Sequence, residues 1–200
     1  MIRKNIVINK TDDISKLKNS KEKKVKVTIL DEKIFIEILK LNREYNLEGK
    51  IEKLIKDRFF NYEPLVHYEV LTYRRERFLI IYFLSSDDIF KRILEDKEDF
   101  VLHVPKLKKD VFQNRFSRKI RIFIEDSSIR TYIKGKLILE KYIEKERINL
   151  EIEEALNFLK ESFKVNREDL KISFKDESIK RSVEKNLLEF GGEKNIYKEA

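Results

Sequence analysis

The chain has 200 residues, of which 41% are hydrophobic and 41% are charged, and its net charge is +8. This composition is too apolar for a disordered chain, and no apolar run reaches the roughly 18 residues that a membrane-spanning helix needs. The sequence contains no Cys, which excludes disulfides and thiolate metal sites and fits a reducing compartment. We therefore expect a soluble intracellular protein.

Two further compositional features bear on source and partners. Few Gly, one Met, no Trp and abundant Lys, Glu and Ile are typical of a thermophile, although the many Asn residues also fit simple codon bias. Residues 1–26 and 104–121 each carry a net charge of +6, which fits nucleic acid, an anionic membrane surface or an acidic partner. For the first segment, a solvated surface is an equally good interpretation.

The first sixty residues predict strands and one helix. Weak alternation over Ile2–Ile8 predicts an edge strand, and Thr11–Lys24 is polar enough for a loop. Two alternating runs, Val25–Leu30 and Lys33–Leu39, predict a hairpin. Apolar residues at helical spacing then predict a helix from Leu47 to about Phe60.

The next segment predicts a second hairpin followed by helices and a strand. Val66–Thr72 and Phe78–Leu84 pair around Tyr73–Arg77, and Phe78–Leu84 is apolar on both faces, so it belongs in the centre of its sheet. Ser85 to Asp88 is a strong helix start. A short strand over 100–104 and a helix over 106–116 complete this half.

The last eighty residues open with a three-stranded antiparallel meander. Its strands are predicted at 120–126, 129–134 and 137–148, with Gly135 in the second turn. A helix with one apolar stripe, which ends near Phe163, follows at once. A strand at 169–174 and a helix at 177–190, stopped by Gly191-Gly192, end the ordered part.

This order of elements predicts an α+β fold in two lobes. The first lobe is expected over residues 1–117 and the second over residues 118–192, with a flexible tail at residues 193–200.

The sequence contains few residues in patterns that indicate catalytic chemistry. The two histidines, His67 and His103, both lie in predicted strands among apolar residues and far apart in sequence. The sequence contains neither a phosphate-binding Gly loop nor a nucleophile or zinc motif. Asp126, at the end of a predicted strand, is the one weak candidate for a cofactor contact, and the Ser127-Ser128 that follows supplies no Gly for a phosphate turn. We therefore predict no enzyme activity, no metal and no cofactor.

Exposed cations are the better candidates for binding. Arg74, Arg75 and Arg77 lie at the turn of the second hairpin, where a charged turn without function is an equally good interpretation. The set Lys106, Lys108 and Lys109 lies in the second basic segment, which also holds aromatic residues. Its Phe112 and Phe116 have core spacing, so nucleic-acid binding is a minority interpretation.

At the level of element order, the chain resembles a group of bacterial assembly-platform proteins. The residues that carry the resemblance are Asp57–Leu71 and Arg77–Leu94, in which a helix ends in an aromatic-Pro segment before two strands and an acidic helix start. The group comprises the actin-like cytoplasmic proteins of type IV pilus machines (the PilM group) and the cytoplasmic part of the type II secretion protein L. The resemblance also places the meander where the actin-like core has its first three strands. Residues 149–164 then correspond to the helix that follows, and residues 170–174 to the next strand.

The resemblance implies a reduced, two-lobed actin-like ATPase (RNase H-like) fold with mixed sheets flanked by helices. It also implies a cytoplasmic scaffold at the inner face of the inner membrane, with a secretion or pilus assembly ATPase and platform proteins as partners. In nucleotide-binding members, Asp at the end of the first strand is followed directly by Gly, and the Ser127-Ser128 here departs from that pattern. The alternatives are a basic nucleic-acid-binding protein and an actin-like ATP-binding protein, and a homodimer stays open.

Overall fold

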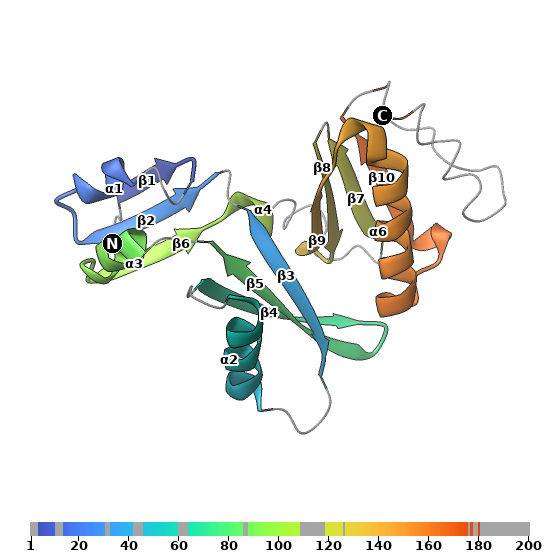
Figure 1. Cartoon of the computed structure of the whole chain (residues 1–200), viewed down its shortest axis with the longest axis horizontal. Coiled ribbons are helices and arrows are strands. Elements are labelled where there is room, and N and C mark those ends of the chain that lie inside the picture. The colour runs from blue at the N-terminus through green and yellow to red at the C-terminus, as the bar shows by residue number, and fades with distance from the viewer. Residues whose placement is uncertain are drawn as a thin grey trace. The chain divides into compact units, whose positions relative to one another are not determined.

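The computed structural model describes residues 4–10, 14–30, 33–41, 46–59, 64–85, 88–108, 119–125, 127–175, 177 and 180 (Figure 1). The chain divides into two compact units, residues 1–111 and residues 112–200. The boundary expected between residues 117 and 118 lies outside the described residues, as does the expected tail at 193–200. Each unit is described by itself below.

The first unit contains a parallel sheet of three strands in the order β1-β2-β6. Its strands are β1 (Lys4–Ile8), β2 (Lys24–Ile29) and β6 (Asp99–His103). Helix α1 (Ser15–Lys18) and helix α3 (Asp88–Glu95) contribute Leu17, Phe90 and Leu94 to its core. The expected edge position of β1 and the strand β6 are confirmed, whereas residues 15–18 form a short helix within the expected loop.

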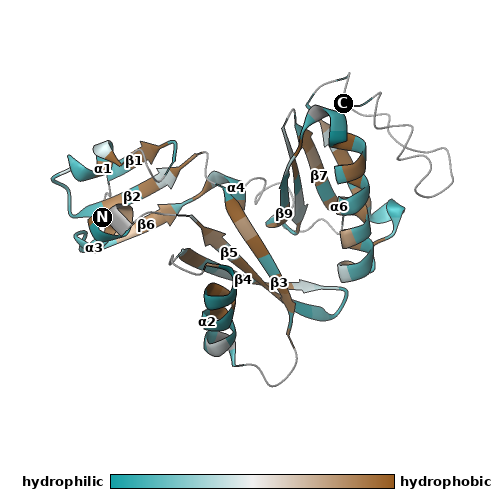
Figure 2. Cartoon of the chain, viewed as in Figure 1, coloured by the Kyte–Doolittle hydropathy of each residue, from teal (hydrophilic) through white to brown (hydrophobic). Residues whose placement is uncertain are grey.

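The second sheet of this unit is antiparallel, in the order β3-β5-β4. Its strands are β3 (Ile34–Lys40), β4 (Leu65–Tyr73) and β5 (Glu76–Leu84), and β5 is central, as its apolar sequence predicts. Helix α2 (Leu47–Arg58) packs Ile51, Leu54 and Ile55 on this sheet, against Leu79, Ile81 and Phe83 of β5. Figure 2 shows the hydrophobic colour of β3 and β5 beside the mainly hydrophilic turns of α2.

The start of α2 is determined locally. The side chain of Asn46 accepts a hydrogen bond from the backbone N–H of Gly49 at 3.1 Å, which satisfies one of the free donors of the first turn. The helix therefore begins at the expected position, and it ends at Arg58, two residues before the expected Phe60.

The hairpin predicted between residues 25–30 and 33–39 is wrong. Strand β2 pairs in parallel with β1 and β6, whereas β3 pairs with β5 in the other sheet. The cause is burial on both faces of β2, where the adjacent residues Val27, Thr28 and Ile29 are all buried. Such a strand belongs at the centre of a parallel sheet, and its alternation does not specify its partner.

The second unit is built on a sheet of four strands in the order β10-β7-β8-β9. Strands β7 (Ile120–Glu125), β8 (Ser128–Ile133) and β9 (Lys136–Tyr142) form the predicted antiparallel meander, and β10 (Leu170–Phe174) pairs in parallel with β7. Helix α6 (Ile148–Phe163) connects β9 to β10 and buries Ile152, Leu156 and Leu159. Short 3-10 turns, η1 (Lys145–Arg147) and η2 (Arg167–Asp169), flank this helix.

The fold class is therefore α+β, with sheets that are flanked by helices, as expected. The strand–strand–strand–helix–strand order of the second unit is the order that the family resemblance implies. Helix α4 (Pro105–Lys108) covers the start of the helix predicted over 106–116. The rest of that helix, and nearly all of the helix predicted over 177–190, lie outside the described residues.

Candidate interaction surfaces

The turn between β4 and β5 holds two arginines in an unusual backbone conformation. Tyr73 pairs with Glu76, so the turn has only two central residues, Arg74 and Arg75, with φ of 48° and 68°. These values are those of a type I′ turn, which needs positive φ at both central positions because its twist matches the strands, and which Asn-Gly usually forms. An ordinary L-residue in this region costs roughly 1–2 kcal/mol. The turn therefore keeps two exposed guanidinium groups at the expense of local stability.

Two neighbouring contacts are made at this turn. The Arg74 guanidinium lies 5.6 Å from the centre of the Tyr73 ring, a cation–π arrangement. Glu76, the nearest acid in the sequence, is paired with Lys40 at 2.6 Å. Arg77 is also exposed and faces Thr72 across the hairpin. The three candidate arginines of this turn therefore lie together at one end of the antiparallel sheet.

Of the other predicted cations, the structure describes the side chain of Lys106 alone. Lys106 was expected to be exposed, but the structure buries it, with 9% of its surface accessible. Lys108 is the last residue of α4, and Lys109 lies outside the described residues. Their role in partner binding stays a prediction.

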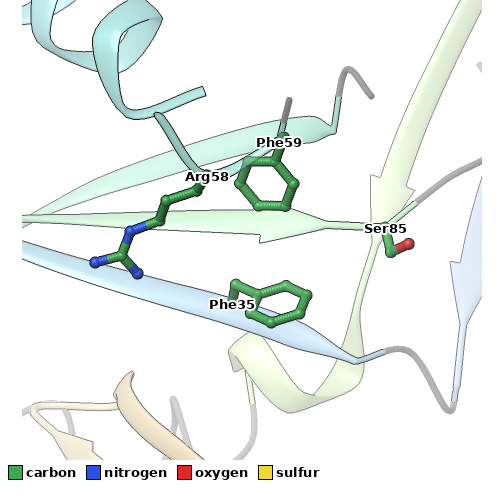
Figure 3. Close-up of a pocket in the computed structure, with 4 residues that line it drawn as sticks. All are labelled: Phe35, Arg58, Phe59 and Ser85. Carbon is green, nitrogen blue, oxygen red and sulfur yellow. The ribbon is translucent and has the colours of Figure 1, made fainter. Parts of the chain in front are cut away.

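A pocket of about 480 Å³ lies beside the end of α2 and is lined by Phe35, Arg58, Phe59 and Ser85 (Figure 3). The ring of Phe59 packs edge-on against Phe35, with the ring centres 5.9 Å apart. It also packs at a tilt against the buried Phe83, with the ring centres 5.2 Å apart. Arg58 is paired with Glu37 of β3 at 2.8 Å, which holds its guanidinium over the strand. No spacing motif marks this pocket in the sequence, because its residues come from β3, α2 and the end of β5.

Asp126 lies outside the described residues, but its neighbours Glu125 and Ser127 make defined contacts. Glu125 forms an ion pair with Arg130, whose side chain is largely buried. The backbone N–H of Ile143 donates to the carbonyl of Ser127 at 2.9 Å, and Ser128 is buried. The carboxylate of Glu125 is thus neutralised, and these contacts tie the turn to β9.

A charged cluster fastens β9 to α6. Lys141 contacts Glu151 at 2.9 Å and also pairs with Glu154. Burial lowers the pKa of Lys141, but hydrogen bonds to Glu154 and Glu151 outweigh it and raise the pKa above the usual lysine value. The hydrogen bond from Lys141 lowers the pKa of Glu154. Mutual stabilisation of this kind is also found in structural ion-pair networks, and here it joins β9 to α6.

The two histidines are separate from each other and lie in different sheets. His67 of β4 stacks on Tyr82 at 5.7 Å and lies 3.8 Å from Glu69. His103 of β6 lies 3.5 Å from the hydroxyl of Thr28. Across the described part of the chain, no three His, Asp or Glu side chains gather in a way that could hold a metal ion.

No described helix is both long enough and apolar enough to cross a membrane.

Comparison with known proteins shows similarity at the level of structure. No protein-family profile matches the chain, and no curated protein matches it. Among solved structures, it is similar to a Bacteroides thetaiotaomicron VPI-5482 protein of unknown function with an actin-like ATPase fold. The TM-score is 0.46 at 15% identity, over 88% of this chain and 68% of that one.

The chain is also similar to Cyto-EpsL, the cytoplasmic domain of EpsL, an inner membrane component of the type II secretion system of Vibrio cholerae. Here the TM-score is 0.33 at 12% identity, over 82% of this chain and 75% of that one.

Proposed function

We propose that this chain is a non-enzymatic cytoplasmic scaffold of a bacterial type II secretion or type IV pilus assembly platform. In this role it links the motor ATPase to the inner-membrane complex through protein–protein contacts. The proposal rests on the family resemblance in the sequence, the order of elements in the second unit and the chemistry of the surfaces described above.

The observation that carries the non-enzymatic part is the β7–β8 turn. Nucleotide-binding members of the resembled group have Asp and then Gly at this point, so that backbone N–H groups can approach a phosphate. Here Ser127-Ser128 follows Asp126, and Glu125 is already paired with Arg130. In addition, the carbonyl of Ser127 accepts a hydrogen bond from the backbone N–H of Ile143, which follows β9.

The observation that supports partner binding is the arginine turn. Arg74, Arg75 and Arg77 present three cations at one end of a rigid sheet, and two of them are kept in a costly backbone conformation. Strain of this kind concentrates where a structure holds side chains for recognition. An acidic segment of the motor ATPase would meet these guanidinium groups, which form paired hydrogen bonds to carboxylates.

A pull-down with the N-terminal region of the motor ATPase from the same genome tests the proposal. Wild-type protein should capture that region, and the variant Arg74→Glu/Arg75→Glu/Arg77→Glu should lose it. A matched control is Lys16→Glu/Lys18→Glu, which changes exposed charges on α1. Equal capture by all three proteins would exclude the arginine turn, and no capture by wild type would count against the scaffold role.

Calorimetry distinguishes the actin-like ATP-binding alternative. Heat on addition of Mg-ATP to the folded protein, lost on Asp126→Ala, would replace the scaffold proposal with a nucleotide-dependent one. The scaffold proposal expects no heat from nucleotide.

A further inference from the structure

Strand β4 is an unusual sheet edge for this chain. It is nine residues long and lies at the end of the order β3-β5-β4. It contains no Lys, Arg or Pro, the residues that usually protect a free edge from pairing with another strand. Every other edge strand of the described sheets except β6 carries a Lys, whereas β6, which like β4 has no Lys, Arg or Pro, begins with an Asp. These residues are Lys4 of β1, Asp99 of β6, Lys40 of β3, Lys136 and Lys141 of β9, and Lys171 of β10.

The exposed side chains of β4 form an apolar row. Val66, Tyr68 and Val70 have 37%, 52% and 41% of their surface accessible and point to the face of the sheet that carries α2. The single charged residue of the strand, Glu69, accepts a hydrogen bond from the hydroxyl of Tyr82 in its own sheet at 3.4 Å. No outward charge therefore opposes an approaching strand.

Among the described strands, none pairs with the outer edge of β4. The two-residue turn makes Tyr73 and Glu76 a hydrogen-bonded pair, and the bonds alternate along an antiparallel ladder. Odd-numbered residues of β4 therefore bond to β5, and the N–H and C=O groups of Val66, Tyr68 and Val70 point to the free edge. The same three residues thus combine exposed apolar side chains with backbone groups that point to the outer edge of the strand.

The sequence of this row is self-complementary. Residues 66–70 read Val-His-Tyr-Glu-Val, so a second copy that runs antiparallel, with Tyr68 opposite Tyr68, also sets Val66 opposite Val70. The same register sets His67 opposite Glu69, and this favourable pair occurs twice by symmetry. Even-numbered residues meet even-numbered residues, so all three outward-pointing backbone pairs can exchange both of their bonds.

We propose that β4 joins two copies of this chain into a symmetric dimer through antiparallel pairing centred on Tyr68. The two sheets then form one continuous sheet of six strands, in the order β3-β5-β4-β4-β5-β3. Since the two-fold axis is perpendicular to the sheet, both α2 helices lie on the same face. This dimer does not depend on the scaffold role, and the arginine turns lie at its two ends, away from the axis.

A second copy fits this edge better than an acidic partner segment. The cations of this hairpin are confined to Arg74, Arg75 and Arg77 beyond the end of the strand, whereas the row itself is uncharged apart from Glu69. An acidic strand along the row would place its charges beside Glu69 and beside apolar side chains. The self-complementary register instead provides an opposite partner for each residue of the row.

Charge substitution at the two-fold centre tests the proposal. Wild-type protein should be a dimer in sedimentation equilibrium, and Tyr68→Lys and Tyr68→Glu should each be monomers because like charges then face each other. An equimolar mixture of the two variants should recover the dimer, since residue 68 meets its own copy only in this register. Leu150→Lys, at an exposed position on α6, is the control and should stay dimeric.

Cysteine cross-linking reports the register directly, because the chain has no Cys of its own. Tyr68→Cys should form a disulfide-linked dimer under mild oxidation, since opposed Cα atoms lie about 5.5 Å apart, within disulfide range. Thr72→Cys should not, because two copies of residue 72 are separated by eight residues, or about 27 Å. Circular dichroism of each variant confirms folding.

The proposal is overturned by any of four results. These are a monomeric wild type at high micromolar concentration, a dimer that persists in Tyr68→Lys, equal cross-linking through residues 68 and 72, and a lysine–glutamate mixture that stays monomeric. A monomer whose β4 edge instead captures an acidic peptide would assign the edge to a different occupant and would also overturn it.

Discussion

Replacing Arg74 and Arg75 in the turn between β4 and β5 tests two effects separately: the stability of the fold and the binding of the partner. In the double variant Arg74→Asn/Arg75→Gly, the turn receives the residues that tolerate positive φ most readily. Both arginines have φ in the left-handed region, 48° and 68°. Relief of that conformation is worth about 1–2 kcal/mol per residue.

Two losses offset part of this gain. The contact between Arg74 and Tyr73 is worth about 0.5–1 kcal/mol at an exposed site. Glycine at position 75 also adds about 0.5–1 kcal/mol of conformational freedom to the unfolded chain. The net expectation is a stabilisation of about 1 kcal/mol. For a unit of the size of residues 1–111, this raises the midpoint of thermal unfolding by about 4 °C.

The same variant should bind the motor ATPase more weakly. The loss of two charged hydrogen-bond donors, at about 1.5–3 kcal/mol each when they meet a carboxylate, predicts a Kd that is at least about a hundredfold higher. Thermal unfolding followed by circular dichroism and a calorimetric titration of the partner measure the two effects. Arg77→Asn is the matched control, because Arg77 lies in the strand without positive φ. It should weaken binding without raising the midpoint.

The reasoning fails if the double variant unfolds at or below the wild-type temperature, since the backbone strain would then be absent. It also fails if binding is unchanged while Arg77→Asn weakens it, because recognition would then lie in the strand instead of the turn.

Four further predictions follow from the described contacts. Phe83→Ala should destabilise the first unit by about 3–5 kcal/mol in urea unfolding, because it empties the site against which Phe59 and α2 pack; a loss below 1 kcal/mol would show that α2 does not depend on this contact. Gly135→Ala should destabilise the meander by about 1 kcal/mol in urea unfolding, because Gly135 has φ of 76° in the β8–β9 turn; unchanged stability would contradict that conformation. Glu154→Gln should reduce stability at neutral pH. The hydrogen bond from Lys141 lowers the pKa of Glu154 in the folded protein. The stability that Glu154 contributes is therefore present above the usual carboxyl pKa and is lost as the pH falls through the lowered pKa of the folded state. A stability difference between wild type and variant that persists in acid would contradict the pairing with Lys141. Phe35→Lys should abolish binding of apolar dyes to the pocket beside α2 without changing oligomeric state, because Phe35 lies on β3 and not on the β4 edge.

How much of the fold could be predicted depends on how local each signal is. The meander over β7, β8 and β9 could be predicted because alternation, β-branched residues and Gly135 specify a chain that folds back on itself. The central position of β5 was also readable from a run that is apolar on both faces. By contrast, β2 has alternation like any strand, and its partners in β1 and β6 lie 21 and 75 residues away along the sequence.

The candidate sites also differ in how far their residues lie apart in the sequence. Arg74, Arg75 and Arg77 are neighbours in sequence, so their common location at a hairpin turn was predictable. The left-handed backbone of Arg74 and Arg75 was not, because nothing in an Arg-Arg dipeptide signals positive φ. The pocket of Phe35, Arg58, Phe59 and Ser85 was missed because it depends on how β3, α2 and β5 meet. The basic sequence neighbours of Lys106 predict an exposed cation, but in the structure Lys106 is buried.

Calorimetric titration with the purified N-terminal region of the motor ATPase from the same genome, without nucleotide, tests the central claim most directly. The scaffold account predicts saturable binding that weakens as the salt concentration rises, because exposed arginines steer the encounter. No heat under these conditions, with binding restored only by Mg-ATP, would contradict it.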